Sequence, residues 1–151
     1  MRIRQLTDKD MYEALNLVWA VFCEFEAPEY DPAGVAVFRK FLDDAPAMMA
    51  AGKLHFWGSF MGDVLAGVIA ARDPSHISLL FVRKEFHRRG IARALFTVVE
   101  GYYRLAGCDS ITVNSSPYAI PVYHRLGFTD TSKETVTDGI RFTQMIYDMN
   151  T

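Results

Sequence analysis

The sequence has few cysteines, no long apolar run and no signal-like N-terminus, and each shortage excludes a class of protein. The two cysteines, Cys23 and Cys108, have no metal-like spacing, so we expect free thiols in a reducing compartment and no bound metal. No apolar run reaches the roughly 18 residues that span a membrane, and the N-terminus is polar. We therefore expect a cytoplasmic chain that makes no membrane contact.

An excess of positive charge is also lacking, since the formal net charge is −2. This balance argues against a dedicated nucleic-acid binder, so we expect no nucleic-acid partner. The charge is nevertheless uneven: five of the 16 Lys+Arg residues lie between Arg83 and Arg93, and four carboxylates gather in Glu24–Asp31. The basic cluster indicates an anionic ligand. The acidic cluster fits either a cationic ligand or an ordinary solvated loop.

The sequence is rich in apolar residues: half of its 151 residues are apolar and 13% are aromatic. This is enough for one domain over residues 1–151 with an ordered core. Hydrophobic periodicity and turn residues predict alternating strands and helices in an α/β (α+β) fold with a mixed sheet. The predicted strands are Arg2–Leu6, Leu54–Phe60, Val64–Ala71, His76–Val82, Ser110–Asn114 and Arg141–Met149, and the predicted helices begin at Thr7 or Asp8 and at Pro32 and cover Ile91–Leu105 and Tyr118–Leu126.

The most informative segment is the basic turn between the predicted strand His76–Val82 and the predicted helix Ile91–Leu105. A strand that enters a helix through a short turn aims several backbone N–H groups and the positive end of the helix dipole at one point. A phosphate or pyrophosphate is the natural ligand of such a point. Gly90 fits this prediction because it leaves the backbone open to a phosphate oxygen and permits a positive φ.

Residues 87–92, His-Arg-Arg-Gly-Ile-Ala, resemble the (Gln/Arg)-x-x-Gly-x-(Gly/Ala) signature of the GNAT superfamily, the acyl-CoA-dependent N-acetyltransferases. His87 departs from the usual Gln or Arg but still donates a hydrogen bond. A second stretch, with Asn114, Ala119, Tyr123 and Leu126-Gly127-Phe128, is similar to the superfamily's second motif on the CoA side. The resemblance covers essentially the whole chain. It implies a mostly antiparallel sheet of six to seven strands flanked by about four helices.

The resemblance also implies roles for individual residues. The backbone of Phe81 and Val82 would pair with the pantetheine arm of acetyl-CoA, the Leu80 N–H would stabilise the oxyanion, and Tyr123 would act as the general acid. The implied cofactor-binding residues are Phe81, Val82, His87, Arg88, Arg89, Gly90, Ile91, Ala92, Arg93, Asn114 and Tyr123. The alternatives stay open at this point: a solvated helix start, a strand-ending Asn114 and a core Tyr123.

The general base is less defined by the sequence. His76, at the head of the cofactor strand, is one candidate because a histidine titrates near neutral pH. Glu24 and Glu26 are the other candidates, acting through a water chain or binding a cationic acceptor. His76 could equally be a structural residue at a strand edge.

The resemblance implies an N-acetyltransferase that moves an acetyl group from acetyl-CoA to a primary amine by direct attack in a ternary complex. A covalent intermediate is disfavoured because neither cysteine has a motif-placed histidine partner. A non-catalytic acyl-CoA-binding module on the same fold is the alternative. We expect a small-molecule or peptide amine as the acceptor, and the chain could be a monomer or a homodimer.

Overall fold

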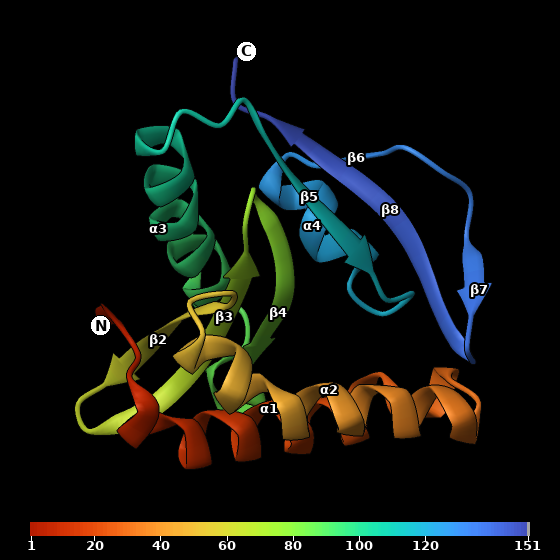
Figure 1. Ribbon diagram of the computed structural model, residues 1–151, viewed down its shortest axis with the longest axis horizontal. Coiled ribbons are helices and arrows are strands. Elements are labelled where there is room, and N and C mark those ends of the chain that lie inside the picture. Colours follow the sequence, from red (N-terminus) through yellow and green to blue (C-terminus); the bar gives the residue numbers. More distant parts are fainter. Residues whose placement is uncertain (151) are drawn as a thin grey trace.

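The computed structural model describes residues 1–150 and consists of a twisted sheet with two helices on each face (Figure 1). The strands are β1 (Arg2–Gln5), β2 (His55–Met61), β3 (Val64–Arg72), β4 (His76–Val82), β5 (Ser110–Ser115), β6 (Thr129–Asp130), β7 (Thr135–Thr137) and β8 (Ile140–Asp148). The helices are α1 (Met11–Phe25), α2 (Pro32–Ala50), α3 (Ile91–Leu105) and α4 (Ile120–Leu126). The predicted α/β fold is confirmed.

The order of strands is β1-β2-β3-β4-β5-β8-β6, and β7 pairs with β8. Every pair is antiparallel except β4–β5, which is parallel. The helix α3 makes the crossover between these two strands, as a parallel connection requires. The sheet therefore changes its connectivity between β4 and β5, in the middle of the molecule.

Both faces of the sheet are buried, and each has its own apolar core. Residues of α1 and α2 cover one face, and residues of α3 and α4 cover the other. This explains β3, in which seven consecutive residues are buried without alternation. The helix α3 is amphipathic and buries Ile91, Leu95, Phe96, Val99 and Tyr103 at helical spacing.

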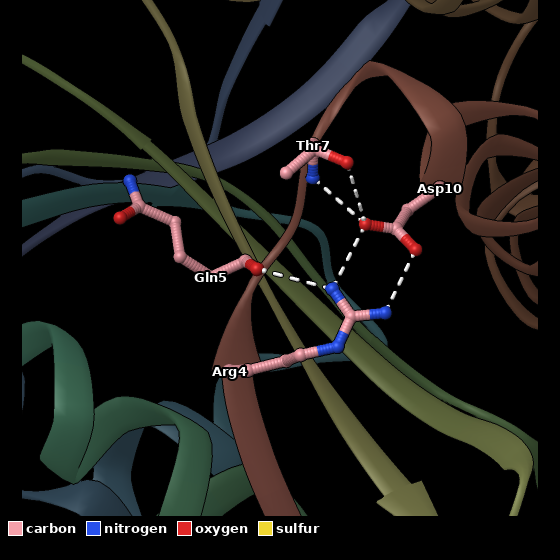
Figure 2. A network of polar contacts seen from close by, with 4 residues as sticks. All are labelled: Arg4, Gln5, Thr7 and Asp10. Carbon is pink, nitrogen blue, oxygen red and sulfur yellow. Dashed lines mark hydrogen bonds and ion pairs between the residues drawn. The ribbon is translucent and has the colours of Figure 1, made fainter.

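The corner between β1 and α1 is fixed by the carboxylate of Asp10 (Figure 2). The Arg4 guanidinium donates two hydrogen bonds of 2.9 Å to its two oxygens, and the Thr7 N–H donates one of 2.7 Å. These donors lower the pKa of Asp10 to about 2, the Arg4 hydrogen bond having the largest effect. The network ties the edge strand to the helix start.

The pairing of β4 with β5 is short, and this shortness creates the site. Only His76↔Thr112 and Ile77↔Val113 are paired, and beyond them the two strands separate. In the same region β3 pairs with Ile77 and Leu79 through consecutive residues, which leaves Ser78 as a β-bulge. Bulges are frequent beside active sites because they redirect the strand.

The longest helix, α2, extends to the tip of the β7–β8 hairpin (Figure 1). Gly34 of α2 meets Gly139 of the hairpin backbone to backbone: a Cβ built on Gly34 would lie 2.2 Å from the Gly139 carbonyl oxygen. Two glycines thus permit the close approach of two distant segments. None of the helices within residues 1–150 has the length and hydropathy needed to cross a membrane.

The structure differs from the predicted elements mainly at segment ends. The first helix starts as a 3₁₀ turn over Asp8–Asp10 and continues to Phe25, so that it extends into the acidic cluster Glu24–Asp31, where proline-containing sequence predicts a loop. The Phe25 ring stacks on Tyr118 at 5.0 Å between ring centroids, so tertiary packing favours the extra turn. The short strands β6 and β7 were not predicted, because they are brief and exposed.

Candidate active site

A cavity of about 130 Å³, here called the smaller cavity, lies where β4 and β5 separate. Its lining brings together the connection between α1 and α2, the middle of β4, the end of β5 and the helix α4. The lining residues are Glu26, Tyr30, Phe38, Ser78, Leu79, Leu80, Phe81, Val113, Asn114, Ser116, Ala119, Tyr123 and Ile140. Five of the predicted site residues, Glu26, Leu80, Phe81, Asn114 and Tyr123, thus meet in one place.

The backbone of β4 presents alternate residues to this opening. The Arg83 N–H donates a 2.8 Å hydrogen bond to the Ala66 carbonyl, so Arg83 and Phe81 face β3. Val82 and Leu80 therefore direct their backbone groups away from β3, toward the gap before β5. The Leu80 N–H points into the region where the resemblance requires an oxyanion donor, whereas the backbone of Phe81 is turned to β3.

Tyr123 lies on α4 and is only 5% exposed. Burial, and secondly the negative charge of Glu26, raise the pKa of its phenol. The hydroxyl therefore stays protonated and available as a donor throughout the neutral range. Glu26 and Tyr123 come from opposite faces of the sheet and line the same smaller cavity.

Glu26 follows the last residue of α1 and is half-buried. Burial raises the pKa of its carboxyl to about 7, while a hydrogen bond with the Ser116 side chain partly opposes the shift and Glu29 adds to it. The Ser116 hydroxyl also accepts a 3.2 Å hydrogen bond from the Ala119 N–H, so α4 holds it in place. Ser116 could not be identified from the sequence, because its role depends on how the loop before α4 meets Glu26.

His76, the other candidate base, is half-buried at the start of β4. Its Nδ1 lies 2.8 Å from the Thr112 hydroxyl oxygen. Burial, and secondly the charge of Arg72, lower the pKa of His76 to about 4, so it does not titrate near 6.5 as its sequence suggested. It is neutral at physiological pH but is a weaker base than Glu26.

The turn between β4 and α3 leaves a set of backbone donors free. The first intrahelical bond of α3 runs from the Ala94 N–H to the Gly90 carbonyl, so the N–H groups of Ile91, Ala92 and Arg93 have no partner within the helix. Gly90 has φ +76°, and a Cβ built on it would meet nothing within 4 Å. Arg88 is also left-handed, with φ 64°. The space above Gly90 is open to a ligand.

Three of the residues around the turn use their side chains for structure. The Arg83 Nε donates to the Leu65 carbonyl at 2.7 Å, and the Arg93 guanidinium donates to the carbonyl of Arg125 at the end of α4. The His87 Nε2 donates to the Val82 carbonyl at 2.7 Å. Val82 therefore keeps only its N–H free for an external partner.

The remaining basic side chains lie at the surface. Lys84 forms a 3.3 Å ion pair with Glu24, and both are exposed. Glu24 consequently lies beside the basic turn and lines neither of the cavities described here. Arg88 and Arg89 are exposed next to Gly90, and the Arg89 guanidinium lies 5.5 Å from the centre of the Phe86 ring. These two arginines are the cations best placed for an anion above Gly90.

A second cavity of about 410 Å³, here called the larger cavity, opens on the α2 side of the sheet. Its lining residues are Val37, Phe38, Phe41, Arg72, His76, Ile77, Ser78, Asn114, Thr137, Asp138, Ile140 and Phe142. It shares Phe38, Ser78, Asn114 and Ile140 with the smaller cavity, so the two adjoin at the separation of β4 and β5. The site thus has two compartments that meet at Ser78 and Asn114.

Comparison with known families gives one match over most of the chain. Residues 26–149 match the family described as the acetyltransferase (GNAT) domain. This range includes the basic turn, both cavities and α4.

Solved structures with this fold cover almost the same length. A GCN5-related N-acetyltransferase from Rhodopseudomonas palustris has a TM-score of 0.83 at 18% identity, over 97% of this chain and 94% of its own. The PaiA N-acetyltransferase of Thermoplasma acidophilum, solved with coenzyme A, has a TM-score of 0.77 at 18% identity, over 97% and 98%. An aminoglycoside 6'-N-acetyltransferase, also with coenzyme A, has a TM-score of 0.71 at 11% identity, over 99% and 97%.

Proposed function

Since the chain belongs to the GNAT acetyltransferase family, and so to the acyltransferases, we propose that it transfers an acetyl group from acetyl-CoA to a primary amine. The amine attacks directly, in a ternary complex. The observation that carries this proposal is the smaller cavity at the separation of β4 and β5, which Leu80, Tyr123 and Glu26 line together and which adjoins the larger cavity. Acetyl-CoA, when bound, supplies a thioester carbonyl and a thiol leaving group.

The residues present fit this cofactor. The open space above Gly90 and the free N–H groups of Ile91, Ala92 and Arg93 suit a pyrophosphate, with Arg88 and Arg89 adding positive charge. The free Val82 N–H suits an amide of the pantetheine arm. The gap between β4 and β5 leaves room for that arm to reach the smaller cavity.

At the reacting centre the Leu80 N–H would donate to the carbonyl oxygen as negative charge develops there. A backbone donor is already oriented by β4 and needs no reorganisation, and one such donor contributes about 3–4 kcal/mol of transition-state stabilisation. The protonated Tyr123 hydroxyl would donate to the departing sulfur from α4. Both donors belong to residues that line the smaller cavity.

The amine must lose a proton, and Glu26 is the better placed of the two candidate bases. With a pKa of about 7, its carboxylate is present at neutral pH and still basic enough to accept a proton. His76 lines the larger cavity on the acceptor side, but a pKa of about 4 makes it the weaker acceptor. We therefore assign the proton to Glu26, directly or through water.

The test is a turnover assay with acetyl-CoA and a panel of primary amines, in which release of free CoA and formation of the acetylated amine are measured together. We expect product to appear in equal amounts with free CoA, and no release of CoA without an amine. Tight binding of CoA with no acetylation of any amine would instead favour the non-catalytic acyl-CoA-binding module.

A further inference from the structure

Most of the apolar side chains that line the larger cavity come from two elements on the α2 side. Val37, Phe38 and Phe41 project from one side of α2, and Ile140 and Phe142 from β8. Three of these five side chains are aromatic: Phe38, Phe41 and Phe142. Such a lining favours a ligand with an apolar body, because transfer of that body from water and its contacts with the aromatic rings stabilise the complex.

The charged groups of the larger cavity are one cation and one anion. Arg72 ends β3 opposite His76 in the strand pairing, and within residues 1–150 it has no ion-pair partner. Asp138 lies at the tip of the β7–β8 hairpin. An unpaired arginine in a ligand cavity is suited to a carboxylate.

The acidic cluster does not contribute to this cavity. None of its four carboxylates, Glu24, Glu26, Glu29 and Asp31, belongs to the lining. Glu24 pairs with Lys84, and Glu26 lies in the smaller cavity. The cationic acceptor that the charge pattern suggested therefore has only Asp138 to bind it, and Arg72 would repel it.

Polar groups for the amine end of a ligand stand where the two cavities join. Ser78, in the bulge of β4, has a buried hydroxyl oxygen with no hydrogen-bond partner among residues 1–150. Asn114 of β5 lines both cavities from the other strand. An unsatisfied buried hydroxyl at this junction is explained if a ligand amine bonds to it.

We propose that the acceptor is a primary amine on an apolar or aromatic body that also carries a carboxylate, that is, an apolar amino acid or a short peptide ending in one. Arg72 binds the carboxylate, the aromatic walls bind the body, and Ser78 with Asn114 directs the amine toward the smaller cavity. This assignment rests on the proposed function, since it names the acceptor of the same site.

The experiment compares phenylalanine with phenylalaninamide, and glycyl-phenylalanine with its amide, as acceptors. Removal of the carboxylate lowers the pKa of the α-amine of phenylalanine, so at neutral pH more of the amide is present as the free, nucleophilic amine. A preference for the acids must therefore come from the site. We expect kcat/KM to favour the acid over the amide by about tenfold in at least one pair. Spermidine, a polycation, should be a poor acceptor.

The variant Arg72→Gln should lose this preference by raising the KM of the acid about tenfold while leaving the amide unchanged. Lys40→Gln removes the same charge from the exposed side of α2 and should change neither acceptor. Calorimetric titration of phenylalanine and phenylalaninamide into the enzyme–CoA complex measures the same preference without turnover.

Three outcomes would overturn this assignment: equal use of acid and amide by the wild type, equal effects of Arg72→Gln on both, or a preference for spermidine. Failure of the proposed function looks different. In that case no amine is acetylated, while the titration still shows whether the CoA complex prefers the carboxylate-bearing ligand and whether Arg72→Gln removes that preference.

Discussion

The cofactor side of the site and the larger cavity are bounded by walls that are built in different ways. The wall on the cofactor side comes from one continuous stretch, β4, the basic turn and the start of α3. The wall of the larger cavity joins α2, the end of β3, the start of β4, the end of β5 and the β7–β8 hairpin, and α2 and the hairpin are far apart along the chain (Figure 1). One wall is set by local sequence and the other by packing between distant segments.

This difference has a functional consequence. Substitutions in the turn should change cofactor binding without changing the acceptor, because the turn lines neither the smaller nor the larger cavity. Substitutions where α2 meets the hairpin should change the acceptor without changing the cofactor. The Tyr123 hydroxyl and the Glu26 carboxylate belong to neither wall, and their loss should affect the rate of chemistry instead.

The largest effect is expected from Gly90→Glu. A carboxylate placed in the open space above the turn opposes the phosphates by charge and by bulk, and like charges in contact cost several kcal/mol. We expect CoA affinity to fall by more than about 100-fold. Isothermal titration calorimetry with CoA measures this affinity.

The matched control is Gly52→Glu, at a glycine with nearly the same backbone conformation, φ +73°, and the same open surroundings. It carries the same left-handed strain and the same charge, but lies in the connection between α2 and β2. Gly52→Glu should therefore lower the stability as much as Gly90→Glu does, but leave the CoA affinity unchanged. Normal CoA affinity in a folded Gly90→Glu protein would exclude the phosphate site at this turn.

Next in size is Tyr123→Phe, which should lower kcat by about 10²–10⁴-fold because the departing sulfur loses its proton donor. CoA affinity should change little, since the ring and its burial are kept. Tyr103→Phe is the control: Tyr103 is also buried and also has a raised pKa, but it lies on α3 and faces Asp73. A Tyr123→Phe enzyme with a normal kcat, on an acceptor whose chemical step is slow, would remove Tyr123 from the mechanism.

The local wall could be predicted from the sequence almost completely. The bounds of β4 and α3 agree residue for residue with the prediction, because an apolar strand, a glycine and an amphipathic pattern follow one another directly. The side-chain roles within it could not be predicted. His87 was expected to face the phosphate, whereas its Nε2 donates to the Val82 carbonyl, a contact that depends on the path of the turn.

The wall that is built by packing between distant segments could largely not be predicted from the sequence. Glu24 and Glu26 are two residues apart and looked equivalent, but a step of two residues on a helix turns a side chain by about 200°. One therefore meets Lys84 at the surface and the other Ser116 in the smaller cavity. The contact of Gly34 with Gly139 has no sequence signal, because it joins segments about a hundred residues apart.

A smaller effect, with a distinct pH signature, is expected from Glu26→Gln. Glu26 accepts a proton only as the carboxylate, so kcat/KM of the wild type should rise with pH through about 7, the pKa of this group. Glu26→Gln should remove this rise and lower the plateau by about 100-fold. The control Glu13→Gln, at an exposed position of α1, should keep the profile.

The same pH profile separates the two candidate bases. If His76 accepted the proton, the rise would lie near pH 4, where its lowered pKa places the change to the neutral form. A rise near 7 that survives in Glu26→Gln would show that neither assignment holds and that the proton leaves through another group.

The smallest effect is expected from Gly34→Ala, which tests the wall built by packing. In a helix, alanine is favoured over glycine by up to about 1 kcal/mol. At Gly34, however, the added Cβ would lie 2.2 Å from the Gly139 carbonyl oxygen, so the hairpin must move. We expect a net loss of about 1–3 kcal/mol of stability and a higher KM for the acceptor, with unchanged CoA affinity.

The control is Gly101→Ala in α3, where a Cβ would meet nothing within 4 Å. This substitution should raise Tm. If both substitutions stabilise the protein and neither changes the acceptor KM, the hairpin does not depend on this contact, and the acceptor wall is held by other packing.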